Sequence, residues 1–230
     1  MCIRYFIPRE FDLPALIYYS FDAAAVSGST LLNLGSGGAA FNAQLINSPA
    51  ISTSDKMVGT GAMQFTSSLS QYVQIPSFTT GTSGLSFAFW FKFSYTGAHS
   101  RVFDFGNDDW SDNILFARWD GNEDIYISTR RSGTPYTQTS VFGQTVNDNT
   151  WRHVVWTLDP SGNWVVYMNG NLLRSYGRVT YPNAVTRTLN YLGKSNWGRQ
   201  PYLNGAIDEF YMFESVLSAD QVKELFKSGQ

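Results

Sequence analysis

The sequence predicts an all-β protein, a jelly-roll sandwich of two antiparallel sheets with one short C-terminal helix. Three observations support this fold class. Apolar and polar residues alternate along most apolar stretches, turn residues separate these stretches, and only one segment has the spacing of an amphipathic helix. Many short antiparallel strands favour a sandwich because each of two stacked sheets can bury its apolar face on the other.

The alternation is clearest between residues 85 and 95. One face of this segment carries large apolar residues and the other mostly small or polar ones: Leu85, Phe87, Phe89, Phe91, Phe93 and Tyr95 against Ser86, Ala88, Lys92 and Ser94. This pattern predicts a half-buried strand whose apolar row faces the core. The same interpretation predicts further strands at residues 72–75, 101–105, 114–119, 124–129, 151–159, 163–169 and 206–214.

Turns and one helix complete the predicted elements. Residues 160–163 and the pair Asn169 and Gly170 predict tight hairpins, because glycine and asparagine tolerate the positive φ angles that such turns need. The helix is predicted from Ser218, which can cap its first turn with the help of Gln221, to a glycine that can end it. Its apolar stripe is Val222, Leu225 and Phe226, and its end is Gly229. We expect the helix to pack at the edge of the sandwich.

Composition limits the domain count and the possible partners. The chain has 230 residues, which suits a single domain over residues 1–230, and its net charge is −2. Because no basic stripe is visible, nucleic acid is not expected as a partner. The single cysteine, Cys2, cannot form an internal disulfide. No apolar stretch is long enough to span a membrane, and no signal peptide is visible, so membrane insertion is not expected.

An ordered set of motifs resembles the laminin-G-like domains of the concanavalin A-like lectin/glucanase superfamily. The motifs are YYSFD, GAMQF, YVQIP, LSFAFWFK, WRHVVWTLDPSGNWVVYMNGNL, LGKSNWG and LNGAIDEFYMFESVLSADQVKELF, which together run from Tyr18 to Phe226. The resemblance implies a concanavalin A-like jelly roll and a location outside the cell, on a cell surface or on a virion. Residues 1–13 fall outside it and are a possible N-terminal arm. The superfamily includes hydrolases, lectins and adhesion modules, so the fold alone does not choose among them.

The sequence disfavours catalysis. Retaining glycosidases need two carboxyl groups about 5 to 5.5 Å apart in one cleft. Related glucanases carry them on a strand with the pattern E-x-D-x-x-E, which this sequence lacks. Asp208 and Glu209 are adjacent, and a regular strand would send them to opposite faces. His99 and His153 have no partnered serine or cysteine, and His153 resembles a structural strand histidine of the family. We therefore predict that the chain is not an enzyme.

Two tryptophan-containing loops predict a carbohydrate site. Sugar rings combine apolar faces with hydroxyl groups, so their sites pair aromatic platforms with planar polar side chains. Residues 105–113 carry such a mixture, and so do residues 194–202, with a third tryptophan at the end of the strand after the first loop. The predicted ligand-binding residues are Trp110, Asp112, Trp119, Trp197, Arg199 and Tyr202. The alternative is that these tryptophans only pack at the sandwich edge.

We therefore predict a non-catalytic, lectin-like module that binds a glycan or polysaccharide. The alternative is a protein-contact, adhesion or structural module without glycan binding, and either could be joined to other domains or subunits of a larger surface assembly. The resemblance also places the first and last strands side by side, so that Asp22 and Asp208 could meet. With Asn33 they form a predicted structural calcium site, since calcium takes six to eight oxygen ligands. The competing interpretation is that Asp208 accepts hydrogen bonds from backbone amides.

Overall fold

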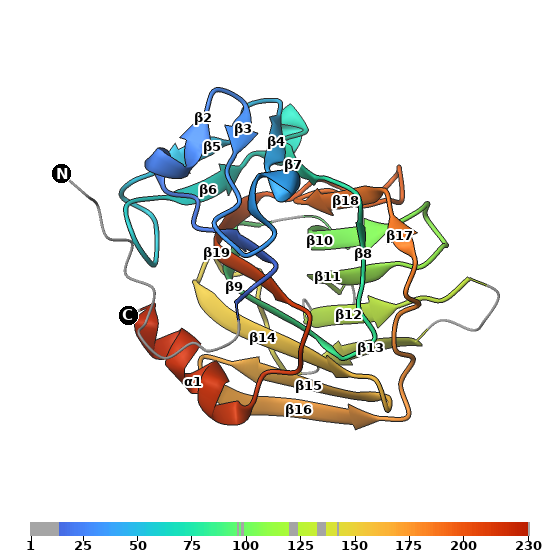
Figure 1. Cartoon of the computed structure of the whole chain (residues 1–230). Helices are drawn as coiled ribbons and strands as arrows, with labels where there is room; N and C mark the ends of the chain where they lie inside the picture. Colours follow the sequence, from blue (N-terminus) through green and yellow to red (C-terminus); the bar gives the residue numbers. More distant parts are fainter. Residues whose placement is uncertain are drawn as a thin grey trace.

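The computed structural model describes residues 14–95, 97, 99–119, 124–132, 137–141 and 143–229. The predicted arm at residues 1–13 lies outside them. Two antiparallel sheets form the fold (Figure 1). Sheet A, with eight strands among the described residues, has the order β16-β15-β14-β9-β19-β6-β5, and β1 also pairs with β19. Its strands are β1 (Ile17–Tyr19), β5 (Ala50–Ser52), β6 (Ala62–Phe65), β9 (Leu85–Phe93), β14 (Arg152–Asp159), β15 (Asn163–Met168), β16 (Asn171–Gly177) and β19 (Gly205–Phe213).

Sheet B lies against sheet A and has nine strands in the described part of the chain. Their order is β13-β12-β11-β10-β18-β7-β4-β3-β2. The strands are β2 (Val26–Ser27), β3 (Thr30–Leu31), β4 (Ala43–Ile46), β7 (Tyr72–Ile75), β10 (Arg101–Gly106), β11 (Ile114–Arg118), β12 (Ile125–Thr129), β13 (Thr137–Val141) and β18 (Leu189–Leu192). A short pair, β8 (Phe78–Thr79) with β17 (Thr186–Arg187), and three short 3-10 helices, Ala23–Ala25, Gly38–Phe41 and Ser67–Leu69, complete the strands and turns.

The core between the sheets is rich in aromatic side chains, as the alternation in the sequence predicted. Phe87, Phe89, Phe91 and Phe93 of β9 all belong to it and are fully buried. Phe89 packs edge to face on a ring of the opposite sheet, Phe116, with 5.0 Å between the ring centroids. The predicted all-β jelly-roll class with two antiparallel sheets is confirmed.

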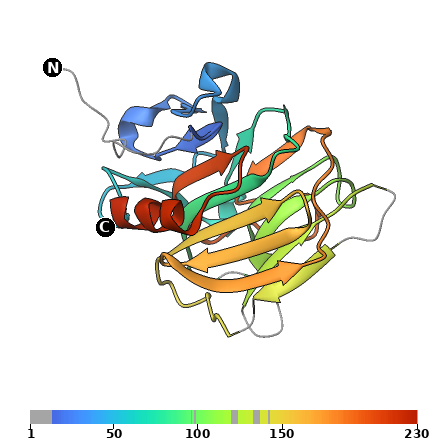
Figure 2. The ribbon, with the colours of Figure 1, turned by 60° about the horizontal axis from the view of Figure 1, so that its bottom comes forward.

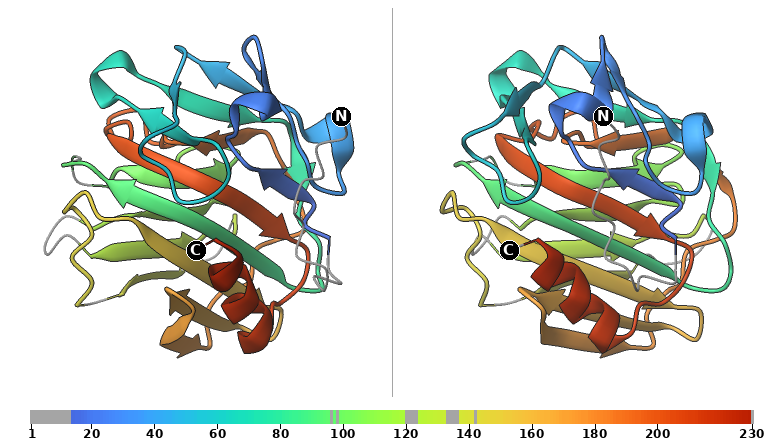
Figure 3. Two further views of the ribbon diagram at one scale, coloured as in Figure 1. Left: turned by 90° about the vertical axis from the view of Figure 1, so that its left-hand side faces the viewer. Right: turned by 60° about the vertical axis from the view of Figure 1, so that its left-hand side comes forward.

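The C-terminal helix lies on the outer face of sheet A (Figures 2 and 3). Helix α1 (Ala219–Ser228) packs through Val222 and Leu225 on an apolar cluster that includes Ala88 of β9 and Val155 of β14. All nine residues of β9 are buried, because the core covers one face and α1, with the segment around Asp55, covers the other. The expectations of a half-buried strand and of a helix at the sandwich edge were wrong, because the helix covers the face that the alternation pattern would leave to solvent.

The predicted caps and hairpin turns are present. The side chain of Ser218 accepts a hydrogen bond from the Gln221 amide, and the Gln221 side chain accepts one from the Ser218 amide, which forms a capping box. Asn169 and Gly170 have φ angles of 49° and 75° between β15 and β16, as a two-residue hairpin requires. Local sequence therefore determines where these elements begin and turn.

Candidate functional site

A pocket of about 250 Å³ lies on the outer face of sheet B. It is formed over β10, β11 and β12, whose opposite faces pack into the core. We call it the aromatic pocket. Its lining residues are His99, Arg101, Trp110, Asn113, Trp119, Tyr126, Ser128, Arg130, Trp197 and Gln200. Three of the six residues predicted as ligand contacts, the tryptophans, are thus brought together in one site from three separate segments of the chain.

The floor of the pocket comes from strand residues that alternate with core residues. In β12, Tyr126 and Ser128 point outward into the pocket, whereas Ile125 and Ile127, which alternate with them along the strand, belong to the core. Tyr126 packs with Leu115 and Ala117 of β11 in a small buried cluster, against which Trp119 and Trp197 rest. Two of the three tryptophans, Trp119 and Trp197, therefore rest on a buried apolar base.

The three tryptophan rings differ in exposure and in partners. Trp110 is 55% exposed and meets Trp197 edge to face, with 5.7 Å between the ring centroids. Trp119 contacts Tyr126 and His99, each with a centroid separation of 5.3 Å. Exposed indole faces held in place by other rings are the kind of surface on which the apolar face of a sugar can pack.

Two arginines lie among these rings. The Arg130 guanidinium is 4.0 Å from the centroid of the Trp110 ring, and that of Arg101 is 5.2 Å from the centroid of Trp197 and 5.7 Å from that of Tyr126. A guanidinium stacked on a ring keeps its N–H groups in its own plane, parallel to the ring, where they remain able to bind oxygen atoms. Arg101, Tyr126, Arg130 and His99 were not predicted, although the alternation in β10 and β12 could have placed the first two on the outer face.

Asp104 of β10 holds the two tryptophan loops together. Its fully buried carboxylate accepts hydrogen bonds from the side chain of Asn113, at 3.2 Å, and from the amide and side chain of Asn196, at 3.1 and 2.9 Å. Arg101 pairs with the same carboxylate at 3.4 Å. Burial raises the pKa of Asp104, and the charge of Arg101 and the donated hydrogen bonds partly oppose this effect. In the sequence, this structural role of Asp104 is indicated by the presence of an aspartate within the largely apolar strand RVFDF, residues 101–105.

The other three predicted contacts lie outside the pocket lining. Asp112 is 5% exposed, and its carboxylate accepts hydrogen bonds from the amide and hydroxyl of Ser132 and from Asn183. Arg199 is exposed on the Trp197 loop. Tyr202 packs on Tyr72, with 6.0 Å between the ring centroids, in a neighbouring group of tyrosines. Asp112 thus serves first to hold loops together, whereas Arg199 and Tyr202 stay at the margin of the site.

Asp208 and Glu209 form a second polar cluster, on the outer face of sheet A. The pairing of β19 with β9 shifts register between Asp208 and Tyr211, and Glu209 has a φ of 51°. Both Ile207 and Phe210 belong to the core, so the two carboxyl groups between them lie on the same outer face. The prediction that they point to opposite faces was wrong, because a β-bulge inserts one extra residue and breaks the alternation.

Both carboxyl groups in this cluster are buried. Asp208 Oδ2 accepts hydrogen bonds from the amides of Met57 and Val58, at 2.9 and 3.0 Å, and burial raises the Asp208 pKa to about 7. Glu209 accepts hydrogen bonds from the hydroxyls of Tyr18 and Tyr211, at 3.0 and 2.5 Å, and burial raises its pKa to about 8. A group that prefers to be neutral at pH 7 is costly to ionise, so this cluster links stability to pH.

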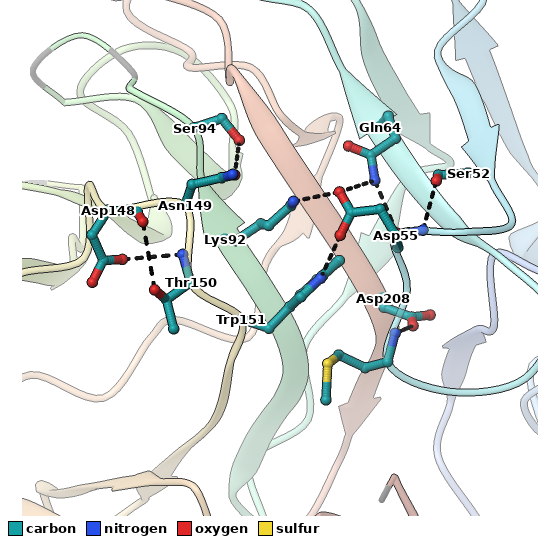
Figure 4. A network of polar contacts seen from close by, with 11 residues as sticks. Ser52, Asp55, Gln64, Lys92, Ser94, Asp148, Asn149, Thr150, Trp151 and Asp208 are labelled. Carbon is teal, nitrogen blue, oxygen red and sulfur yellow. Dashed lines mark hydrogen bonds and ion pairs between the residues drawn. The ribbon is translucent and has the colours of Figure 1, made fainter.

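The segment that covers Asp208 is anchored by Asp55 (Figure 4). Asp55 forms an ion pair with Lys92 of β9 and accepts a hydrogen bond from the indole nitrogen of Trp151 at 2.9 Å. Its backbone carbonyl accepts a hydrogen bond from the Gln64 side chain at 3.1 Å. These contacts hold residues 55–58 over sheet A and thereby exclude water from Asp208.

The residues predicted to bind calcium fit the metal only in part. Asp208 Oδ1 is buried and makes no hydrogen bond within the described residues, and Asp22 interacts electrostatically with Asp208. Asn33 does not fit, because its side-chain oxygen already accepts hydrogen bonds from the amides of Tyr18 and Gly35. In the described ranges no group of three or more histidine, cysteine, aspartate or glutamate side chains is arranged to hold a metal. Backbone oxygens and water would have to complete the coordination.

A family model described as the concanavalin A-like lectin/glucanases superfamily matches residues 66–223. The chain belongs to this superfamily. No curated protein sequence matches it. Among solved structures, domain 4 of AbnA, a GH43 extracellular arabinanase from Geobacillus stearothermophilus in complex with arabinotriose, has a TM-score of 0.71 and 22% identity, over 95% of this chain and 100% of that one.

Two toxin domains have the same fold. The binding domain of Paraclostridial Mosquitocidal Protein 1 has a TM-score of 0.68 and 14% identity, over 94% of this chain and 52% of that one. The binding domain of Botulinum Neurotoxin DC, in complex with SialylT, has a TM-score of 0.64 and 15% identity, over 95% of this chain and 52% of that one. This chain therefore spans about half the length of each toxin domain. Within the described residues, no helix combines the length and the apolar character needed to cross a bilayer.

Proposed function

We propose that this chain is a non-catalytic carbohydrate-binding module whose aromatic pocket holds the sugar. The observation that carries the proposal is the convergence of Trp110, Trp119 and Trp197 on one pocket. Its wall also contains Tyr126 and hydrogen-bonding side chains from Asn113 and other residues. Aromatic faces beside a few fixed polar groups are what a sugar ring, with its apolar face and its fringe of hydroxyls, requires.

The composition of the pocket supports binding without hydrolysis. Glycosidases that act through paired carboxyl groups need both of them in the cleft, and no aspartate or glutamate is among the described residues that line the aromatic pocket. Asp208 and Glu209 lie on the outer face of the other sheet, buried beneath residues 55–58 and tyrosine side chains. A polysaccharide would have no access to them without displacement of those covers.

The proposed setting is outside the cell, as one part of a larger enzyme or surface assembly. The extracellular arabinanase whose domain 4 has this fold, and the toxins whose binding domains do, support that setting. The arabinotriose in the arabinanase domain supports a glycan as the partner. The alternative, a protein-contact module, would be favoured by tryptophans on a flat patch, whereas these line a hollow.

A glycan array followed by titration calorimetry tests the proposal. Trp110→Ala should weaken binding at least ~30-fold, which corresponds to a central contact of about 2 kcal/mol. It should leave the melting temperature unchanged, because the side chain is 55% exposed. Tyr95→Ala is the matched control, since Tyr95 is 86% exposed and outside the pocket. Binding that survives Trp110→Ala, or an array on which no glycan is retained, would favour the protein-contact alternative.

We also propose that a structural calcium ion binds between the first and last strands of sheet A. Asp22 would supply Oδ2, since its Oδ1 already accepts hydrogen bonds from Thr60 and Gly61, and Asp208 would supply Oδ1. The bound cation would stabilise both carboxylates in their ionised forms. The buried Asp208 Oδ1 atom without a hydrogen bond in the described residues supports this assignment. Its role would be to tie β1 to β19, which pair side by side, and not to contact the sugar.

A further inference from the structure

Positive charge is concentrated on the outer face of sheet B. Arg101 and Arg130 line the aromatic pocket. Lys194 lies beyond it, with its ammonium 4.5 Å from the Tyr72 ring centroid and 4.2 Å from that of Tyr191. The whole chain has a net charge of −2, so this concentration is local and not a consequence of a basic composition.

The pocket and the lysine belong to one continuous surface. Tyr191 on β18 is the direct register partner of Asp104 on β10, and Asp104 joins the two loops that carry Trp110 and Trp197. Tyr72 contacts Tyr191 edge to face, with 5.5 Å between the ring centroids. We call Tyr72, Tyr191, Tyr202 and Lys194 the tyrosine cluster. A second set of rings and a second cationic position thus lie one strand away from the pocket.

Acidic groups offset only part of this charge. Asp104 pairs with Arg101, but it is fully buried beneath the pocket. Asp108, at the exposed rim, lies close enough to Arg130 for their charges to interact. No carboxylate of the described residues lies within 4.0 Å of the Lys194 ammonium. Among the described residues of these loops and strands, Arg101, Arg130, Lys194 and Arg199 stand against Asp104, Asp108 and Asp109, and of these carboxylates Asp104 is buried.

We infer that this face binds an acidic polysaccharide, with a carboxylate-bearing sugar in the aromatic pocket and a neighbouring acidic sugar at the tyrosine cluster. The inference rests on the proposed function, since it names the ligand class of the same site. Guanidinium groups match the two oxygens of a carboxylate, and rings on which they stack hold them in place before the ligand arrives. The volume of about 250 Å³ is below the ~300 to 1,000 Å³ of pockets for drug-sized ligands, as suits one or two sugar rings.

The test compares uronate polysaccharides with their neutral counterparts. Polygalacturonate, alginate and hyaluronate are each titrated against the chain, and so is the carboxyl-reduced form of each, which keeps the sugar ring without the charge. At least one uronate should bind, and its reduced form should bind about 10-fold to 100-fold more weakly, as expected for loss of charge-assisted hydrogen bonds. The affinity for the uronate should also fall with added salt.

Two variants locate the charge effect. Arg130→Gln and Lys194→Gln should each weaken uronate binding about 10-fold and leave the melting temperature unchanged. Lys223→Gln is the control, because Lys223 is exposed on α1, which lies on the outer face of the other sheet. Equal binding of a uronate and its reduced form, or retention of neutral glycans alone, overturns the inference and leaves the proposed function standing. Tighter binding of dextran sulfate than of any uronate overturns the carboxylate assignment, and no binding of any glycan defeats both proposals.

Discussion

The buried carboxyl groups of β19 make the stability of the protein depend on pH. Folding raises the pKa of Glu209 from 4.5 to about 8 and that of Asp208 from 3.8 to about 7. Because the folded state holds these protons more tightly than the unfolded state, their contribution is fully present at low pH and is lost as the pH rises through the folded values. Stability should therefore fall between about pH 6.5 and pH 9.

The size of this loss follows from the two pKa values. Each pKa unit corresponds to about 1.4 kcal/mol. Above pH 6.5 both groups are ionised in the unfolded state, whereas in the folded state Glu209 stays protonated for about 1.5 further pH units and Asp208 for about 0.5. The sum of about 2 pH units corresponds to a loss of roughly 3 kcal/mol in the free energy of unfolding by pH 9. The window begins at pH 6.5 because burial lowers the pKa of His153 to about 3, so that below 6.5 this histidine reduces stability as the pH falls.

The assay is urea denaturation between pH 6.5 and pH 9 in the presence of a metal chelator. Glu209→Gln should remove most of the slope, since a glutamine oxygen can still accept the hydrogen bonds from the hydroxyls of Tyr18 and Tyr211. Glu224→Gln, an exposed change on α1, is the control and should leave the slope as it is in the wild type. A flat wild-type profile, or a slope that persists in Glu209→Gln, would refute the account of these buried carboxyl groups.

Three further predictions concern the calcium site and the core. Thermal melts with calcium and with chelator should differ at pH 8, with calcium raising the midpoint through Asp22 and Asp208; an unchanged midpoint would exclude the metal. Phe89→Ala should lower the free energy of unfolding by about 3 to 5 kcal/mol in urea titrations, since the side chain is fully buried in the core; a loss below ~1 kcal/mol would contradict its central position. Gly205→Ala should also destabilise the fold, by about 1 to 3 kcal/mol in the same titration, because the added Cβ would lie 2.1 Å from the carbonyl oxygen of Lys92; a fully stable variant would contradict this close approach of backbones.

Alternation and turn chemistry predicted the main strands, because both are local properties. The predicted strand at residues 72–75 coincides with β7, and the cap at Ser218 begins α1 as expected. Strand β16 was not predicted from its residues. Its side chains are mostly exposed at the sheet edge, so they carry no apolar alternation. The resemblance to the laminin-G-like domains also proved correct, because it rested on an ordered set of motifs and not on one.

The sequence by itself determined the all-β class, the helix cap and the hairpin turns, and it identified the three tryptophans as candidate ligand contacts. Each of these features depends on residues that are close together in the chain. Tertiary structure decided the rest. The pocket exists because β10, β11 and β12 pair side by side and Asp104 joins loops about 90 residues apart in the chain. The bulge at Glu209 put two carboxyl groups on one face, where alternation predicted two faces. Such outcomes depend on which segments pair and which face is covered, and this is set by the free energy of burial over the whole sandwich and not by any local pattern.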